Sequence, residues 1–159
     1  MKPAPRLATF LSIAVIGSGV AVIGAATTWY RTTQPSRSIT SGIGVVRLPG
    51  AVHAHSPSDL GSPILPIAVL CLVCGLLAFL VGPRARAALI GLVIVGAVAL
   101  IPLTFTVKKP VEAGARVQST AGRVVTPIGA VVALSAAVPA FPISAKVRRV
   151  RMPETGPEA

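Results

Sequence analysis

Two cysteines spaced as C-x-x-C, Cys71 and Cys74, are the residues whose type and spacing come closest to a known chemical motif. In a soluble redox fold this spacing marks a reactive dithiol. Here both thiols lie inside an apolar run of Leu, Val and Ala, which favours the neutral form of the thiol. Because the thiolate is the nucleophile and the metal ligand, we interpret them as small packing residues. A redox or metal role is the alternative.

A second candidate is the segment His53-Ala54-His55, which is followed by Asp59. In an extended chain the two imidazoles face the same way, and with the carboxylate they could ligate a metal ion. The chain has only these 2 histidines, so the ligand set is short of a fourth member. We therefore favour a solvated loop over a weak metal site, and predict no metal and no cofactor.

The carboxylates are too few and too scattered for acid–base catalysis. The 4 acidic residues are Asp59, Glu112, Glu154 and Glu158. Two lie in the C-terminal tail and two in separate loops, whereas acid–base catalysis needs titratable groups within hydrogen-bond reach. No phosphate-binding loop, nucleophile elbow or zinc-protease motif is present in the sequence. We predict no catalytic residues and no enzyme activity.

The composition indicates that lipid is the solvent of most of the chain. Of 159 residues, 53% are hydrophobic and 12% charged, and the mean hydropathy is +0.80. A soluble domain carries roughly 25% charged residues. The net charge of +11 would suggest nucleic acid in a soluble protein. Here the basic residues flank apolar runs, as they do in membrane proteins, so we predict membrane lipids as partners and no nucleic acid.

Four apolar runs predict four transmembrane helices. Their approximate bounds are 7–28, 64–81, 87–106 and 127–145. Each is close to the ~20 residues that span the bilayer core, and none contains an acidic or basic residue. In lipid the backbone must satisfy its own hydrogen bonds, which makes such runs helices.

The predicted fold class is therefore an all-α integral membrane protein, a four-transmembrane-helix bundle in a single domain over residues 1–151. The residues after it, 152–159, are expected to be a disordered cytoplasmic tail. The first run follows Lys2 and Arg6 and could be a signal peptide, but it is longer than the 7–15 apolar residues of that class. We interpret it as a retained helix.

Basic residues at the helix ends predict the orientation. They crowd the short inner connection and the end of the last helix: Arg84, Arg86, Lys146, Arg148, Arg149 and Arg151. Short segments rich in Lys and Arg stay in the cytoplasm and contact anionic lipid. We predict both termini in the cytoplasm of a bacterium, with the chain in its cytoplasmic membrane. Trp29 and Tyr30, at the opposite end of the first helix, fit the aromatic belt that anchors helices at the interface.

The two outer loops, 29–63 and 107–126, contain short β-branched stretches. These predicted strands are Ile43–Leu48, Phe105–Lys109, Ala115–Gln118 and Gly122–Thr126. A small antiparallel sheet is expected to cap the outer face of the bundle. The segment His53–Ser62 is predicted to be irregular loop.

Small residues recur at helical spacing in all four apolar runs. They are Gly17, Gly19, Gly24, Cys74, Ala78, Gly82, Gly91, Gly129, Ala133 and Ala137. Rows of small residues let helices approach closely in lipid. They predict contacts within the bundle, or, as the alternative, contacts with other integral membrane subunits.

The chain resembles the small four-pass membrane proteins of actinobacteria, including those linked to tryptophan-biosynthesis operons. The resemblance rests on Thr28-Trp29-Tyr30-Arg31 after the first helix, the long outer loop, the Arg-containing inner hairpin and the basic segment Arg148–Pro153. It covers the whole chain as topology. It supplies no catalytic residues, and it implies the form of an accessory subunit of an envelope assembly.

Taken together, these features predict a non-enzymatic accessory subunit of a larger membrane complex, such as a lipid importer or a respiratory assembly. One alternative is a stand-alone lipid- or small-molecule-binding protein, with a groove between the first and fourth helices opened by Gly17, Gly19 and Pro139. Another is an oligomeric pore lined by Ser and Thr, although the helices hold few such residues.

Overall fold

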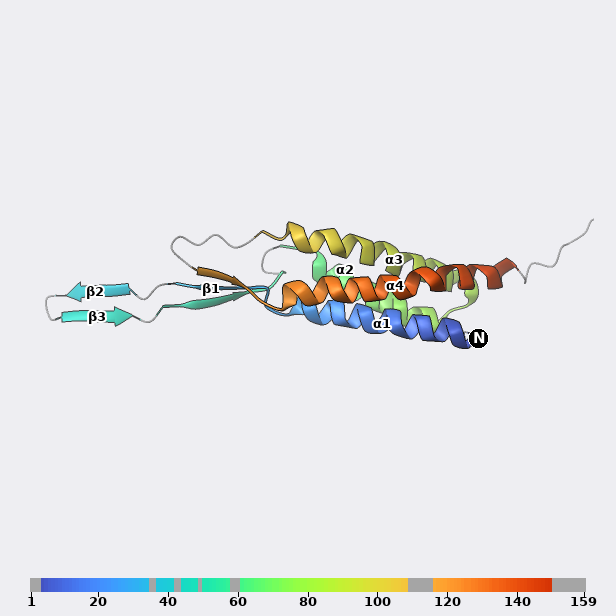
Figure 1. Cartoon of the computed structure of the whole chain (residues 1–159), viewed down its shortest axis with the longest axis horizontal. Coiled ribbons are helices and arrows are strands. Elements are labelled where there is room, and N and C mark those ends of the chain that lie inside the picture. The colour runs from blue at the N-terminus through green and yellow to red at the C-terminus, as the bar shows by residue number, and fades with distance from the viewer. Residues whose placement is uncertain are drawn as a thin grey trace, which may run out of the picture.

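The computed structural model describes residues 4–34, 37–41, 44–48, 50–57, 61–108 and 116–149. Within these residues, four helices pack side by side into an elongated bundle, and the strands leave one end of it along the same long axis (Figure 1). The molecule is therefore an apolar rod with a β extension.

All four predicted helices are present, with shifted boundaries. They are α1 Pro5–Ala26, α2 Ile64–Leu80, α3 Pro83–Thr106 and α4 Gly122–Arg149. Proline occupies the first turn of α1 and of α3, where its missing N–H would be unpaired in any case. The α4 helix continues through Pro139 and Pro142 to Arg149, so these prolines do not end it.

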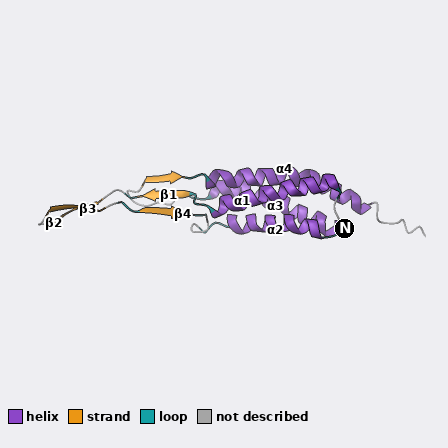
Figure 2. Cartoon of the chain, turned by 90° about the horizontal axis from the view of Figure 1, so that it is seen from below, coloured by secondary structure: helices purple, strands orange, loops and turns teal. Residues whose placement is uncertain are grey.

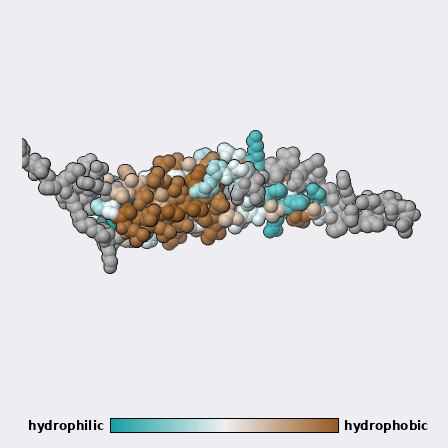
Figure 3. All heavy atoms as spheres, turned by 180° about the vertical axis from the view of Figure 1, so that it is seen from behind, coloured by the Kyte–Doolittle hydropathy of each residue, from teal (hydrophilic) through white to brown (hydrophobic). Residues whose placement is uncertain are grey.

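Three of the helices are long and apolar enough to cross a membrane. These segments are Pro5–Ala26, Ala85–Thr106 and Gly122–Ala145, of 22, 22 and 24 residues. The fourth, α2, is a shorter apolar helix of 17 residues. Apolar side chains form a continuous band over the bundle on the face seen in Figure 3, and polar residues begin where the strands begin. These features indicate a multi-pass membrane protein.

The closest helix contact joins α1 to α4 through glycine. A Cβ on Gly17 would lie 2.9 Å from the Cα of Ala133, and a Cβ on Gly129 would lie 2.9 Å from the Cα of Ala21. Backbone therefore touches backbone, as small residues permit in lipid. At the level of Gly17 and Gly129 this contact leaves no space between the first and fourth helices.

The other small residues divide into two groups. A Cβ on Gly24 would meet Thr126, a Cβ on Gly91 would lie 3.8 Å from the ring of Phe141, and Cys74, Ala78, Ala133 and Ala137 are buried. No atom of the described residues lies within 4 Å of a Cβ built on Gly19 or on Gly82. Gly19 and Gly82, which were predicted to make helix or partner contacts, therefore make no close helix contact within the described residues, and Gly82 precedes α3 as its N-cap. Contact with a partner subunit stays a prediction for both.

A three-stranded antiparallel sheet begins where the bundle ends. Its order is β4 (Val52–His55), β1 (Tyr30–Thr33), β5 (Arg116–Ser119). The predicted strand near Ala115–Gln118 corresponds to β5. The loop expected at His53–Ser62 instead contributes its first residues to β4, because they pair with β1.

Of the two other predicted strands, Phe105–Lys109 begins in a helix and Gly122–Thr126 lies wholly in one. Phe105 and Thr106 are the last residues of α3. Gly122–Thr126 forms the first turn of α4, since the backbone N–H groups of Val124 and Val125 both donate to the carbonyl oxygen of Ala121. The β-branched residues of this segment predicted a strand. The two backbone hydrogen bonds to Ala121 show that it is helical instead.

A second pair of strands, β2 (Arg37–Ser41) and β3 (Gly44–Leu48), extends beyond the sheet. We call these two strands the arm. Thr33 pairs with Val52 in the sheet, and Arg37 pairs with Leu48 in the arm, so the register continues without a slip. The expected small antiparallel sheet is thus present at one end of the bundle, and its strands and the arm run along the long axis, away from the helices (Figures 1 and 2).

Arg86 has a structural role at the other end of the bundle. It is 5% exposed, and its Nε and Nη2 donate to the carbonyl oxygens of Ala78 and Val81, each at 2.8 Å. It caps the C-terminus of α2, as basic side chains commonly do. Arg86 was predicted to contact anionic lipid or to set the topology. Its buried guanidinium is directed to the end of α2, and its part in the topology stays a prediction. The side chains of Arg84, Lys146, Arg148 and Arg149, and all of Arg151 and the tail 152–159, lie outside what the structure describes.

Candidate functional site at the junction of sheet and bundle

Trp29 connects three parts of the chain. Its side chain is fully buried, and the indole Nε1 donates to the carbonyl oxygen of Gly24 at 2.9 Å. Its backbone N–H donates to His55, and its carbonyl oxygen accepts from the N–H of Thr120, both at 2.9 Å. Trp29 thereby ties the end of α1 to the β4 and β5 segments of the sheet.

Tyr30 is buried on the same side of the junction. Its hydroxyl donates to the carbonyl oxygen of Val107 at 3.4 Å, and the guanidinium carbon of Arg123 lies 5.8 Å from the ring centroid. That distance is within the range of a cation–π interaction. The two aromatic residues were predicted to be anchors at the membrane interface. Both are fully buried within the chain, so their rings contact protein. They fix the sheet to the bundle.

The close approach of α1 and α4 at this junction requires glycine at position 122. A Cβ there would lie 2.9 Å from the Cδ1 of Trp29 and 3.0 Å from the carbonyl oxygen of Gly24, and would also meet the hydroxyl of Thr27. The sequence analysis did not assign Gly122 to the junction. Because Gly122 precedes Arg123 and two valines, its segment was predicted only to be a strand.

The two histidines lie on β4, and they differ in their surroundings. His55 Nε2 lies 3.2 Å from the hydroxyl of Thr32, a buried residue of β1, whereas His53 is exposed. No three His, Cys, Asp or Glu residues gather to hold a metal within the described part of the chain. Asp59, the third ligand of the hypothetical site, lies outside the described residues.

Cys71 lies in the interface between α2 and α3, and Cys74 lies in the core cluster with Leu11 and Ile90. Both are buried free thiols, and Cys71 Sγ is 4.0 Å from the carbonyl oxygen of Val93. A Cβ on Gly96 would meet the same sulfur atom. The structure thus places Cys71 where a small side chain fills the space left by a glycine on the facing helix.

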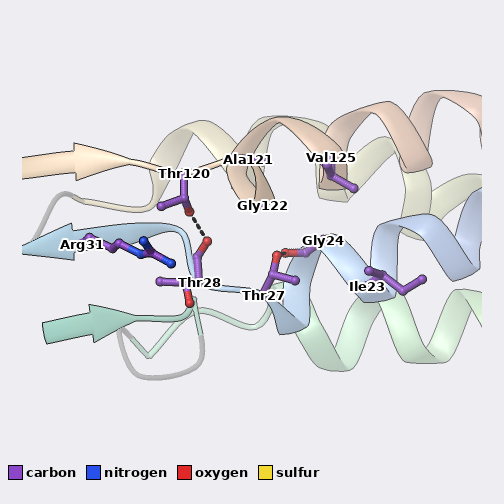
Figure 4. A pocket seen from close by; sticks show the side chains of 9 residues that line it. All are labelled: Ile23, Gly24, Thr27, Thr28, Arg31, Thr120, Ala121, Gly122 and Val125. Atoms are coloured by element: carbon purple, nitrogen blue, oxygen red, sulfur yellow. Dashed lines mark hydrogen bonds between the residues drawn. The ribbon is translucent and has the colours of Figure 1, made fainter.

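A pocket of about 280 Å³ opens at the junction, between the end of α1 and the start of α4 (Figure 4). Its lining comes from α1 and the following loop, from β1, and from the start of α4: Ile23, Gly24, Thr27, Thr28, Arg31, Thr120, Ala121, Gly122 and Val125. The Arg31 side chain points from β1 back toward Thr28. Sequence reasoning missed this pocket, because its lining residues come together only when β5 and α4 pack against β1 and α1.

Two hydroxyl groups of the pocket brace its walls. Thr27 Oγ1 donates to the carbonyl oxygen of Gly24 at 2.8 Å, and Thr120 Oγ1 donates to that of Thr28. Ile23 is exposed at 63% and forms an apolar edge on the side of the bundle. The pocket therefore combines a basic, hydroxyl-bearing side toward the sheet with an apolar side toward the helices.

No protein-family model matches this chain, and no curated protein matches it either. The likeness to small four-pass actinobacterial proteins accordingly stays a prediction, and the function has to be argued from the junction and the arm.

Proposed function

We propose that this protein is a non-enzymatic accessory subunit of a larger membrane complex, and that its arm binds another protein of that complex outside the bilayer. The observation that carries the proposal is the arm itself, a hairpin held beyond the bundle by the buried residues Trp29 and Tyr30. An envelope transporter such as a lipid importer, or a respiratory assembly, is the class of complex we propose.

The arm has the geometry of a strand-pairing partner. It contains two strands, so each has one edge that is paired and one whose backbone groups are unpaired within the described residues. Such edges accept a further strand from another chain. A two-stranded hairpin is also marginally stable alone in water, so contact with a second protein would stabilise it.

The topology favours four crossings, with the arm on the outer side. The ends of α1 and of α3 both lie at the sheet, because Trp29 contacts the β5 segment and Tyr30 contacts Val107. The chain must return between them, and α2 is the helix that returns it. With both termini in the cytoplasm, as the basic segments predict, the sheet and the arm are extracytoplasmic.

The test removes the arm and keeps the sheet. Gln34 donates its backbone N–H to the carbonyl oxygen of Ala51 at 2.9 Å, so these two residues still belong to the paired hairpin. Replacing residues 35–50 with the dipeptide Asn-Gly closes the shortened hairpin with a favoured two-residue turn. The tagged protein is purified from native membranes in mild detergent, and the subunits that co-purify are quantified by mass spectrometry.

We expect stoichiometric partner subunits with the wild-type chain and their loss from the shortened one. A matched control replaces only residues 42–43 with Asn-Gly, which introduces the same turn and keeps both strands of the arm. This control should retain the partners. Purification of the wild-type chain without stoichiometric partners would refute the accessory role, and equal recovery with the shortened chain would refute the role of the arm.

A further inference from the structure

We propose that the pocket at the junction binds the phosphate of an anionic lipid headgroup, with the Arg31 guanidinium as the principal ligand. The lipid belongs to the leaflet on the side of the sheet. This site is separate from the arm. It lies at the ends of α1 and α4, beyond the level of Gly17, where the two helices touch.

The pocket lies at the level along the molecule where a lipid headgroup would lie. On the side of the bundle, its wall is formed by Ile23 and Val125, which belong to apolar helices that can cross the membrane. On the side of the sheet, its wall begins at Thr28, where α1 has ended and the chain approaches β1. The pocket thus lies at the boundary between the apolar band and the polar extension, where lipid phosphates lie.

The alternation of β1 directs Arg31 to the pocket side. Tyr30 and Thr32 are buried against the bundle, and Arg31 and Thr33 are exposed on the other face. Thr33 pairs with Arg116, so Arg116 shares the exposed face with Arg31. Diagonal neighbours on one face of a sheet lie about 7–8 Å apart, close enough for two guanidinium groups to approach one phosphate.

The positive charge at this face has no counter-charge among the described residues. All four acidic residues lie in segments that the structure does not describe. Within the described residues, neither Arg31 nor Arg116 has an ion pair. A guanidinium presents paired donors that match the oxygens of a phosphate, which makes phosphate a suitable ligand for Arg31.

The rest of the lining suits an amphiphile better than a free ion. Thr28 is half-buried in the pocket, and its hydroxyl can donate to a phosphate oxygen. Gly122 is the first residue of α4, and the N-terminus of a helix carries a partial positive charge that favours an anion. The exposed side chain of Ile23 continues from the pocket along α1 toward the bilayer, where an acyl chain would lie.

The test compares lipid adducts by native mass spectrometry of the whole protein in a neutral detergent. The probes are phosphatidylglycerol, phosphatidylcholine and inorganic phosphate. The variants are Arg31→Gln, which removes the ligand, and Ala121→Phe, which fills the pocket from an exposed position. The matched control is Lys108→Gln, which removes one exposed positive charge at the same end of the bundle.

We expect phosphatidylglycerol to bind the wild-type chain and the Lys108→Gln control, and to bind Arg31→Gln about tenfold more weakly, as for loss of one charge-assisted pair. Ala121→Phe should weaken it as well, and phosphatidylcholine should bind less because its choline is repelled. Equal adducts on wild type and both variants would overturn the proposal. Displacement of the lipid by equimolar inorganic phosphate would overturn the lipid assignment, because it would mark a site for the free anion.

Discussion

The indole Nε1 of Trp29 lies 2.9 Å from the carbonyl oxygen of Gly24 and donates a hydrogen bond to it. Gly24 lies in the last turn of α1, where carbonyl groups lack partners within the helix. The bond therefore satisfies the helix end, and it joins that end to the first residue before the sheet. It is one of several contacts at the junction, with those of Tyr30 to Val107 and of Trp29 to His55 and Thr120, that hold the sheet to the bundle.

Replacing Trp29 with Phe should lower the stability of the protein. The ring is retained in part, but the indole donor is lost. The free energy of unfolding should fall by about 1 kcal/mol, the net value of one hydrogen bond, because the Gly24 carbonyl oxygen keeps the Thr27 hydroxyl as a partner. The measurement is the midpoint of thermal unfolding in detergent, followed by circular dichroism. Phe105→Leu is the control, since Phe105 is exposed, and a similar loss in both variants would argue against a specific role for Trp29.

Substitution by alanine should change the free energy of unfolding differently at Gly17 and at Gly19 of α1. Gly17→Ala places a Cβ against the backbone of Ala133, so we expect a loss of about 1–3 kcal/mol as α1 and α4 separate. Gly19 has open space around it, so Gly19→Ala should be neutral or stabilising by about 0.5–1 kcal/mol through higher helix propensity. Unfolding midpoints of the two variants measure this difference. Equal effects would show that the α1–α4 contact is misplaced.

Much of the fold could be predicted from the sequence, and the failures share one cause. Uncharged apolar runs of spanning length identify helices locally, so all four were found. Strand β4 was missed because its evidence is its pairing partner, β1, which is distant along the chain. The burial of Trp29 and the pocket beside Arg31 depend in the same way on contacts with the Thr120–Val125 segment. Composition at one helix end cannot distinguish an aromatic that faces lipid from one covered by a sheet.

The contact between α2 and α3 should show specific coupling. Gly96→Ala directs a Cβ onto Cys71 Sγ, so we expect destabilisation of about 1–3 kcal/mol. Cys71→Ala removes the sulfur atom and should restore much of that loss in the double variant. A double-mutant cycle on unfolding free energies measures the coupling. Strictly additive effects would contradict the packing of Cys71 against Gly96.

Loss of the Arg86 guanidinium should destabilise the hairpin of α2 and α3. Arg86→Gln leaves two buried carbonyl oxygens at the end of α2 without their charged donors, and the expected cost is about 2–3 kcal/mol. Lys108→Gln removes an exposed charge and should change the unfolding midpoint little. If both variants unfold at the wild-type temperature in detergent, Arg86 does not cap α2.

The most direct test of the central claim is photo-crosslinking from the arm in native membranes. A benzophenone amino acid is placed at position 46 in β3, and for comparison at position 95, where Val95 is exposed on α3. The accessory role predicts a discrete protein adduct from position 46 and lipid adducts from position 95. Failure of position 46, and of its cross-strand neighbour position 39, to capture any protein would contradict the role of the arm as a partner-binding element.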